Sequence, residues 1–319
     1  MGRALRTVML TGIGFHSGHF ERLAAARLRP IMASPDELGR LGREAYGYVL
    51  GGDERITQDV LDAMPMLEAI SFVGVGLAQF VDCPAARSRG IALMNTPGLM
   101  VDAVTEHTLG FLLGLQRGLF RHNDAAKHGR IHIGETQALS DSTVGIVGLG
   151  RIGLEVARQL RAGVARGAEL LYWSRSQHIE VEAELDIRFA SLPDIFARSN
   201  SVLLLLAAPP ETHGIIGEEL FARIQAPIFL INTAAAELVD PWALRAALDQ
   251  GRIAGAAFDG YWQEPLPPPS SDPFGLLSYS DSKFVVTPHV AAKASNAWPR
   301  MVDAAVENLV RHFGAGNGA

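Results

Sequence analysis

The 319-residue chain has one cysteine, Cys83, and no long apolar run. A single cysteine forms no disulfide within the chain, and this scarcity is typical of proteins from a reducing compartment. The most apolar short stretch, 202–208, is far below the ~20 residues that span a bilayer. The first twenty residues lack the charged start and apolar core of a signal peptide. These absences predict a cytoplasmic protein with no membrane role.

Positive charge is also sparse. The chain has 28 Lys and Arg against 34 Asp and Glu, for a net charge of −6, and has no basic run. Such a surface repels phosphate backbones, so we expect no nucleic-acid partner. A small anion can still bind where backbone amides and local cations converge.

The pattern along the chain predicts two α/β domains. The length exceeds the ~100–200 residues of a usual domain, and short apolar runs alternate with helical patterns, which is typical of parallel sheets covered by helices. The expected strands of the first domain are 7–10, 28–33, 46–50, 67–73 and 91–94, with a helix at 57–64. The expected strands of the second are 143–147, 169–173, 201–206, 227–231, 253–258 and 283–286.

Two apolar helices join these series. Apolar residues recur at three- and four-residue spacing over 99–120, which predicts a long helix buried between domains or subunits. A polar loop is expected at 121–142, and helices at 241–248 and 299–313. We expect the second domain, 96–287, to be inserted into the first, which comprises 1–95 and 288–319.

A glycine-rich turn lies between the predicted strand 143–147 and a predicted helix 154–160. It reads Gly148-Leu149-Gly150-Arg151-Ile152-Gly153. Glycine suits the tight turn, the approach of backbone to a pyrophosphate and close helix packing, and the helix N-terminus offers N–H groups to phosphates. With strand, turn and helix all present, the pattern predicts a dinucleotide site.

The next predicted strand ends at Trp173 and is followed by Ser174 and Arg175. A site for NAD usually has an acidic residue here, which binds the ribose 2′-hydroxyl. A hydroxyl and a guanidinium instead suit a 2′-phosphate. The residues favour NADP, and NAD remains open because Arg175 can also be an ordinary surface charge.

Further motifs resemble the D-isomer-specific 2-hydroxyacid dehydrogenases over 61–309. The resemblance is carried by Asn95-Thr96-Pro97-Gly98, Glu106-His107-Thr108, Ile231-Asn232-Thr233, Leu238-Val239-Asp240, the segment from Gly255 to Leu266, and Thr287-Pro288-His289. It implies two doubly wound parallel-sheet domains, a Rossmann cofactor domain inserted in a flavodoxin-like substrate domain.

The resemblance also implies an activity, the reversible hydride transfer between a 2-hydroxy acid and its 2-keto acid. His289 would then exchange the hydroxyl proton, and Glu264 would orient the imidazole and favour its protonated form. Asp259, as a partner of the nicotinamide carboxamide, and Thr233 would contact the cofactor. Backbone amides would receive the substrate carboxylate, at Val73, Gly74, Val75 and Gly76.

The chain departs from the family where an arginine is expected, because position 235 is alanine. That arginine would bind the carboxylate and polarise the keto oxygen. Losing one such donor typically costs about 10²–10³ in rate. No other arginine can be assigned the role from the sequence, although Arg300 is close to the His289 segment. Ala78-Gln79-Phe80 also stands where the family usually has an Asp-Asn pair.

Three explanations of Ala235 stay open. An arginine was replaced deliberately to trap a ligand, or the chain is a natural enzyme with another carbonyl substrate and activator. In the third, the chain binds dinucleotide without turnover, as a sensor or scaffold resembling the C-terminal binding protein corepressors. The family resemblance and the apolar helix 99–120 both favour a homodimer.

Other histidines are weaker candidates. His128 and His132 are four residues apart but lack a third ligand, so no metal site is predicted there. His16 and His19, in the loop after the first strand, could reach substrate, although a surface position is the simpler expectation.

Overall fold

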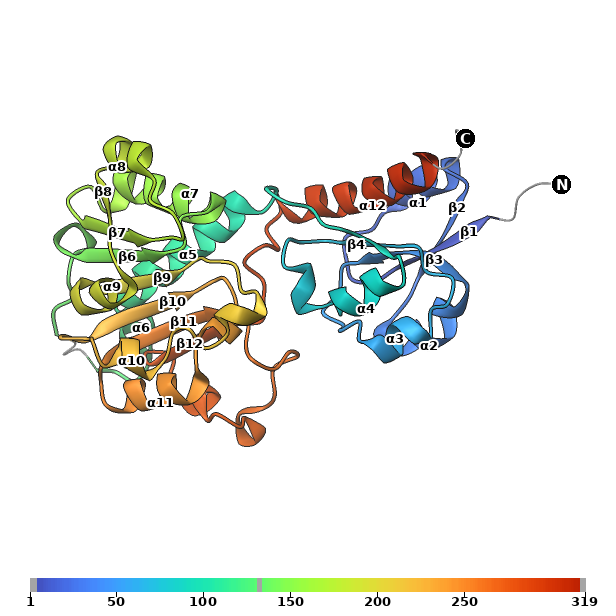
Figure 1. Cartoon of the computed structure of the whole chain (residues 1–319). Helices are drawn as coiled ribbons and strands as arrows, with labels where there is room; N and C mark the ends of the chain where they lie inside the picture. The colour runs from blue at the N-terminus through green and yellow to red at the C-terminus, as the bar shows by residue number, and fades with distance from the viewer. Residues whose placement is uncertain (1–4, 131–133, 316–319) are drawn as a thin grey trace. The chain divides into compact units, whose positions relative to one another are not determined.

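The computed structural model describes residues 5–130 and 134–315. The chain forms two compact units (Figure 1). The first unit comprises residues up to Met100 and from Ala292 onward, and the second is Val101–Ala291. The sequence-based boundaries lie five residues earlier at the first junction (95 against 100) and four earlier at the second (287 against 291). The second unit is therefore inserted into the first.

The first unit is built on a five-stranded parallel sheet in the order β2-β1-β3-β4-β5. This is the flavodoxin-like order, as expected. The predicted strands are all present, with ends that shift by up to two residues. Their bounds are β1 (Arg6–Leu10), β2 (Leu28–Met32), β3 (Ala45–Leu50), β4 (Ala69–Phe72) and β5 (Ala92–Met94).

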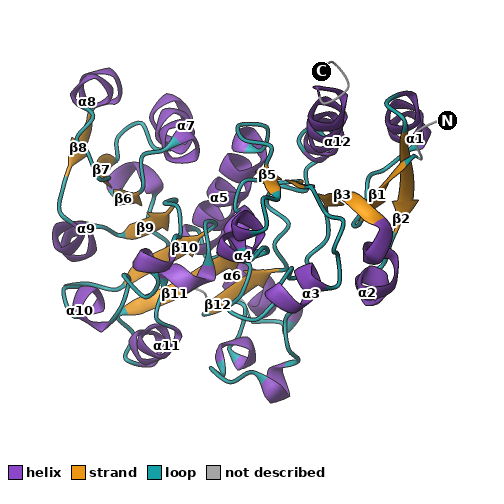
Figure 2. Ribbon diagram, turned by 45° about the vertical axis from the view of Figure 1, so that its right-hand side comes forward, coloured by secondary structure: helices purple, strands orange, loops and turns teal. Residues whose placement is uncertain are grey.

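Helices cover both faces of this sheet (Figure 2). On one face lie α1 (Ser17–Ala25) and α12 (Trp298–Ala315), and on the other α2 (Leu38–Leu41), α3 (Gln58–Asp62) and α4 (Cys83–Ser88). The side of α12 that carries Met301, Val302 and Val306 is fully buried against β3 and β4. Because its apolar residues recur every three or four positions, α12 has one apolar side, and this side packs the end of the chain against the sheet of the first unit.

The second unit has a seven-stranded parallel sheet in the order β12-β11-β10-β9-β6-β7-β8. Six strands match predicted ones, namely β6 (Thr143–Val147), β7 (Glu169–Trp173), β9 (Ser201–Leu204), β10 (Ile228–Asn232), β11 (Ile253–Asp259) and β12 (Phe284–Thr287). The prediction missed β8 (Ile187–Phe189), an edge strand that buries only Ile187. The strand order reverses beside β6, as in a Rossmann sheet.

Two groups of helices pack on this sheet. α5 (Val101–Gln116) and α7 (Arg151–Gln159) lie on one face, while α9 (Leu192–Arg198), α10 (Glu218–Phe221) and α11 (Pro241–Asp249) lie on the other. The remaining helices are α6 (Leu119–Lys127) and α8 (Ile179–Leu185). α5 buries its apolar side against β9, β10 and β11 of its own unit. The packing of α5 on its own sheet accounts for the apolar side of this helix.

The predicted helix 99–120 is in fact two helices. α5 ends at Gln116, and Gly118 adopts a left-handed conformation with φ +61° before α6 begins. A glycine adopts this conformation at little cost and interrupts the helical hydrogen bonds. The polar segment after it is therefore helical as far as Lys127, where the sequence predicted a loop.

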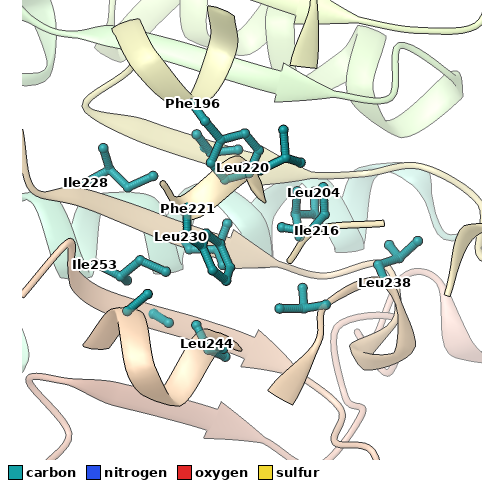
Figure 3. Packing of buried hydrophobic residues seen from close by; sticks show 14 of the residues in the cluster. Phe196, Leu204, Ile216, Leu220, Phe221, Ile228, Leu230, Leu238, Leu244 and Ile253 are labelled. Atoms are coloured by element: carbon teal, nitrogen blue, oxygen red, sulfur yellow. The ribbon is translucent and has the colours of Figure 1, made fainter. Parts of the chain in front are cut away.

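The core of the second unit holds the strands in register. Figure 3 shows buried side chains of β9, β10 and β11 together with side chains from α9, α10 and α11. The labelled members are Phe196, Leu204, Ile216, Leu220, Phe221, Ile228, Leu230, Leu238, Leu244 and Ile253. This packing fixes the carboxyl ends of the strands, where the candidate site lies. No helix among residues 5–130 and 134–315 is both long and apolar enough to cross a membrane.

Candidate active site

The glycine turn follows β6 and leads directly into α7. Gly148 has φ +106°, and a Cβ there would lie 2.6 Å from the backbone nitrogen of Leu206. A Cβ on Gly153 would lie 2.0 Å from the carbonyl oxygen of Gly148, so the helix packs too closely for a side chain. Gly150, the N-cap, has open space around it and no side-chain cap. The first N–H groups of α7 are thus accessible to a phosphate, and the turn fits a dinucleotide.

After β7, the Ser174 hydroxyl donates a 2.5 Å hydrogen bond to the carbonyl oxygen of Ser176. This bond shapes the loop that carries Arg175. The Arg175 side chain is exposed. It offers a guanidinium at the position where a ribose 2′-substituent is recognised in Rossmann sites.

The end of β10 is held by a buried asparagine that the sequence-based prediction gave no role. The Asn232 side chain accepts hydrogen bonds from the N–H groups of Ala234 and Ala235, at 3.1 and 3.2 Å, and donates to the Ala235 carbonyl at 2.7 Å. The Thr233 hydroxyl lies 2.7 Å from that of Thr108, whose own proton goes to the Val104 carbonyl. Thr233 therefore donates to α5 through its side chain.

His289 and Glu264, the candidate acid/base pair, lie next to each other. The imidazole Nδ1 lies 3.3 and 3.2 Å from the two carboxylate oxygens of Glu264. Tyr261 donates its backbone N–H to Glu264 at 3.3 Å, which helps to fix the carboxylate. With Nδ1 facing an acceptor, Nε2 is the nitrogen suited to proton exchange with a substrate. The predicted pairing of these two residues is present in the structure.

The backbone around this pair is unusual. His289 has φ +53°, a left-handed conformation that non-glycine residues seldom adopt and that concentrates at functional sites. Gly260 has φ +105°, and a Cβ there would lie 2.8 Å from Glu264 Oε1 and 3.6 Å from His289 Nδ1. The pair therefore requires glycine at 260. The Asp259-Gly260 dipeptide, a turn signal, was the clue in the sequence.

Asp259 anchors the segment that carries His289. Its buried carboxylate accepts hydrogen bonds from Thr287 Oγ1 at 2.6 Å and from the N–H groups of Val290 and Ala291 at 2.8 Å each. His107 Nε2 donates to or accepts from Thr287 Oγ1 at 3.1 Å. These bonds make Asp259 a positioning residue for the His289 loop, in addition to its predicted contact with the cofactor.

In the first unit, the segment Val73–Gly76 follows β4. The N–H of Val73 bonds to the Leu50 carbonyl within the sheet, and that of Gly74 donates to Thr96 Oγ1 at 3.0 Å. Within the described part of the chain, the N–H groups of Val75 and Gly76 donate no hydrogen bond. Two of the four predicted amides are thus engaged elsewhere, and Val75 and Gly76 carry the capacity to bind an anion.

Ala235 is buried, with 6% of its surface exposed, and it packs beside Ala236 and Leu238. It caps the short helical turn Ala236–Leu238 and presents only a methyl group. Arg300, the nearest arginine to His289 in the sequence, donates to the Leu99 carbonyl at 3.1 Å within the first unit.

The prediction that His19 lies on the surface was wrong, because only 1% of this residue is exposed. Its Nδ1 accepts the His16 N–H at 3.1 Å and its Nε2 lies 3.0 Å from Asp303, so it docks α1 on α12. His16, His19 and Asp303 are spaced closely enough for a metal. However, both Nδ1 atoms accept backbone N–H groups, so both Nε2 atoms carry protons in the neutral rings. His132 lies outside the described residues.

Comparison with known proteins agrees with this geometry. Residues 109–291 match the model of the D-isomer specific 2-hydroxyacid dehydrogenase, NAD binding domain. The chain is 33% identical over 287 residues to a glyoxylate reductase of Thermofilum pendens, covering 87% of this chain and 81% of that protein. It is 32% identical over 297 residues to glyoxylate/hydroxypyruvate reductase B of Escherichia coli K12, covering 92% and 88%.

Solved structures share the fold along nearly the whole chain. The TT0316 protein from Thermus thermophilus superposes with a TM-score of 0.80 at 30% identity, over 95% of this chain and 96% of that one. The D-lactate dehydrogenase from Aquifex aeolicus, solved with NAD and lactic acid, gives a TM-score of 0.81 at 24% identity, over 97% and 96%. The second unit binds a nicotinamide dinucleotide, and the chain belongs to the D-isomer specific 2-hydroxyacid dehydrogenase family.

Proposed function

We propose that the chain reduces a small 2-keto acid to its 2-hydroxy acid with NADPH. The observation that carries this proposal is the His289–Glu264 pair at 3.2 Å, set in a strained backbone at the carboxyl end of the cofactor-binding sheet. Relatives named glyoxylate reductase and glyoxylate/hydroxypyruvate reductase favour a short substrate. The reduced nicotinamide supplies the hydride that adds to the carbonyl carbon.

The chain's own residues manage the proton and the carboxylate. Glu264 holds the Nδ1 proton of His289, so that Nε2 gives its proton to the developing alkoxide oxygen. In the oxidative direction the same nitrogen takes the hydroxyl proton back. The N–H groups of Val75 and Gly76 orient the substrate by its carboxylate.

Ala235 makes the proposed reaction slow. A methyl group offers no donor to the keto oxygen, and losing one such donor costs about 10²–10³ in rate. Whether the alanine is native or was introduced, the consequence for the transition state is the same.

The direct test follows NADPH absorbance with purified protein and a panel of 2-keto acids that includes glyoxylate, hydroxypyruvate and pyruvate. We expect slow but measurable oxidation of NADPH that requires the keto acid. A protein that binds NADPH and turns over none of the panel would contradict the proposal and favour the scaffold alternative.

Arg175 sets the coenzyme preference in this proposal. Arg175→Ala removes the guanidinium that would pair with the 2′-phosphate, and a charge-assisted contact of this kind is worth about 10- to 100-fold in Kd. We expect that loss for NADPH and little change for NADH, measured by fluorescence titration. Arg158→Ala on α7, where Arg158 pairs with Glu184 at the surface, is the matched control. Equal effects on both coenzymes would refute the assignment.

A homodimer is the second part of the proposal. A cavity of about 460 Å³ at the α5–α6 junction is lined by Leu115, Phe120, Phe229 and Ile253, and Leu119 beside it is 58% exposed. Exposed apolar surface of this kind favours association with a second copy. We expect light scattering to give twice the chain's 34.2 kDa, and a charged substitution, Leu119→Glu, to shift the mass toward the monomer. A monomeric starting protein would contradict this part.

The scaffold alternative makes a different prediction from the same measurements. A protein resembling the C-terminal binding protein corepressors would assemble when dinucleotide is added, and it would stay inactive even after the substitution Ala235→Arg. A molar mass that rises with added dinucleotide, without turnover in the starting protein or in the Ala235→Arg variant, would favour this alternative.

A further inference from the structure

We propose that Lys293 supplies the positive charge that binds the substrate carboxylate, in place of the arginine absent from position 235. The inference rests on the proposed function, since it names a residue of the same reaction. Lys293 matched no motif in the sequence, and its role follows from its contacts and its place in the chain.

Lys293 follows His289 closely in the sequence. Three residues lie between them, so their Cα atoms are at most about 14 Å apart at full extension. The His289 end of this segment is anchored on Asp259 through Val290 and Ala291. The first unit resumes at Ala292.

The contacts of Lys293 place its ammonium at the carboxyl edge of the first sheet. Nζ lies 3.7 Å from Asp53 Oδ1 and 5.7 Å from the centre of the Trp298 ring. The ring is fixed by a 3.0 Å hydrogen bond from Trp298 Nε1 to the Ile13 carbonyl. Asp53 follows β3 and Ile13 follows β1, so both mark the carboxyl ends of parallel strands.

The anion-binding amides lie on that same edge. Val75 and Gly76 follow β4, which pairs in parallel with β3. The carboxyl ends of neighbouring parallel strands meet at one edge of a sheet, which is where ligands of such sheets bind. The ammonium and the two N–H groups therefore lie at the same edge of the first sheet. The ammonium attracts a carboxylate by its charge, and the N–H groups can donate hydrogen bonds to it.

The ion pair between Lys293 and Asp53 is weak. A separation of 3.7 Å exceeds the 2.7–3.2 Å typical of a hydrogen bond, and the Asp53 side chain is 54% exposed. Exposed pairs of this kind contribute little stability. Exchange of Asp53 for a substrate carboxylate thus costs little, while the Trp298 ring keeps the ammonium in place.

Lysine is a partial replacement for arginine. Its ammonium attracts a carboxylate strongly as a point charge, but it lacks the planar fork that also polarises the keto oxygen. The substrate is therefore bound with adequate affinity but is less well activated. This division explains how a chain with Ala235 would keep substrate binding and a slow turnover.

The test compares Lys293→Met with Lys293→Arg, and uses Arg55→Met and Arg300→Met as controls for other cations of the first unit. We measure KM and kcat for the preferred 2-keto acid, the Kd of NADPH, and the Kd of oxamate, an unreactive 2-keto acid analogue, on the NADPH complex. We expect Lys293→Met to raise KM and the oxamate Kd about 10- to 100-fold, with the NADPH Kd unchanged. Lys293→Arg should stay within a few-fold of the starting protein.

Other results would overturn the inference. Unchanged oxamate binding in Lys293→Met would do so, and so would a larger loss in Arg55→Met, which would assign the role to Arg55. In the double variant Ala235→Arg, Lys293→Met, the new arginine should restore oxamate binding. If the starting protein turns over no keto acid, the proposed function fails, whereas the oxamate titrations still decide the role of Lys293.

Discussion

His289→Asn is expected to lower kcat for 2-keto acid reduction by about 10²–10⁴, the usual contribution of a positioned general acid. Asparagine has no proton to give at neutral pH, so water must protonate the alkoxide. The Kd of NADPH should not change, because the glycine turn that holds the coenzyme lies on a different loop. Stopped-flow absorbance at saturating NADPH measures the chemical step.

The companion variants sharpen this result. Glu264→Gln keeps the size of the side chain but removes its charge, so we expect the pH dependence of kcat to move along with a smaller loss of rate. His128→Asn, at the exposed end of α6, is the control for removing a histidine elsewhere. A His289→Asn protein with the activity of the control would show that another group donates the proton.

Ala235→Arg is expected to raise kcat/KM by about 10²–10³, the contribution of one donor to a developing oxyanion. The Asn232 side chain already fixes the backbone at this position through three hydrogen bonds, so the new side chain starts from a rigid base. Steady-state kinetics on the same panel of keto acids gives the number.

The Ala235→Arg experiment has two controls. Ala235→Met adds length without donors and should bring no gain, and thermal unfolding should show that neither variant has lost its fold. An unchanged rate for Ala235→Arg would mean that no arginine was ever needed here, and would favour a natural enzyme with another activator. A full restoration would favour the view that an arginine once stood at this position.

Sequence patterns predicted the strands well because parallel strands buried on both faces form short apolar runs. The edge strand β8 escaped because it buries only Ile187 and so has no such run. The single predicted helix 99–120 was wrong because apolar spacing continues through Gly118, and only the backbone conformation of that glycine reveals the break.

Site residues that act through their side chains were predictable from the sequence. Those that act through backbone N–H groups were predictable only in part, because other residues determine which N–H groups are available. His289 and Glu264 were paired from motif positions. The number of amides available between Val73 and Gly76 depended on Leu50 and Thr96, which are remote in sequence. Likewise, the burial of His19 depends on Asp303 in the last helix, a contact that no local pattern encodes.

Because the backbone of residue 289 is left-handed, a substitution there is expected to affect activity and thermal stability differently. Histidine at this φ is conformationally strained. Asparagine tolerates the left-handed region better, so the substitution would partly relieve the strain. The inactive His289→Asn chain should thus melt no earlier than the active one. We therefore propose that histidine occupies position 289 for its chemistry and not for the stability of the backbone.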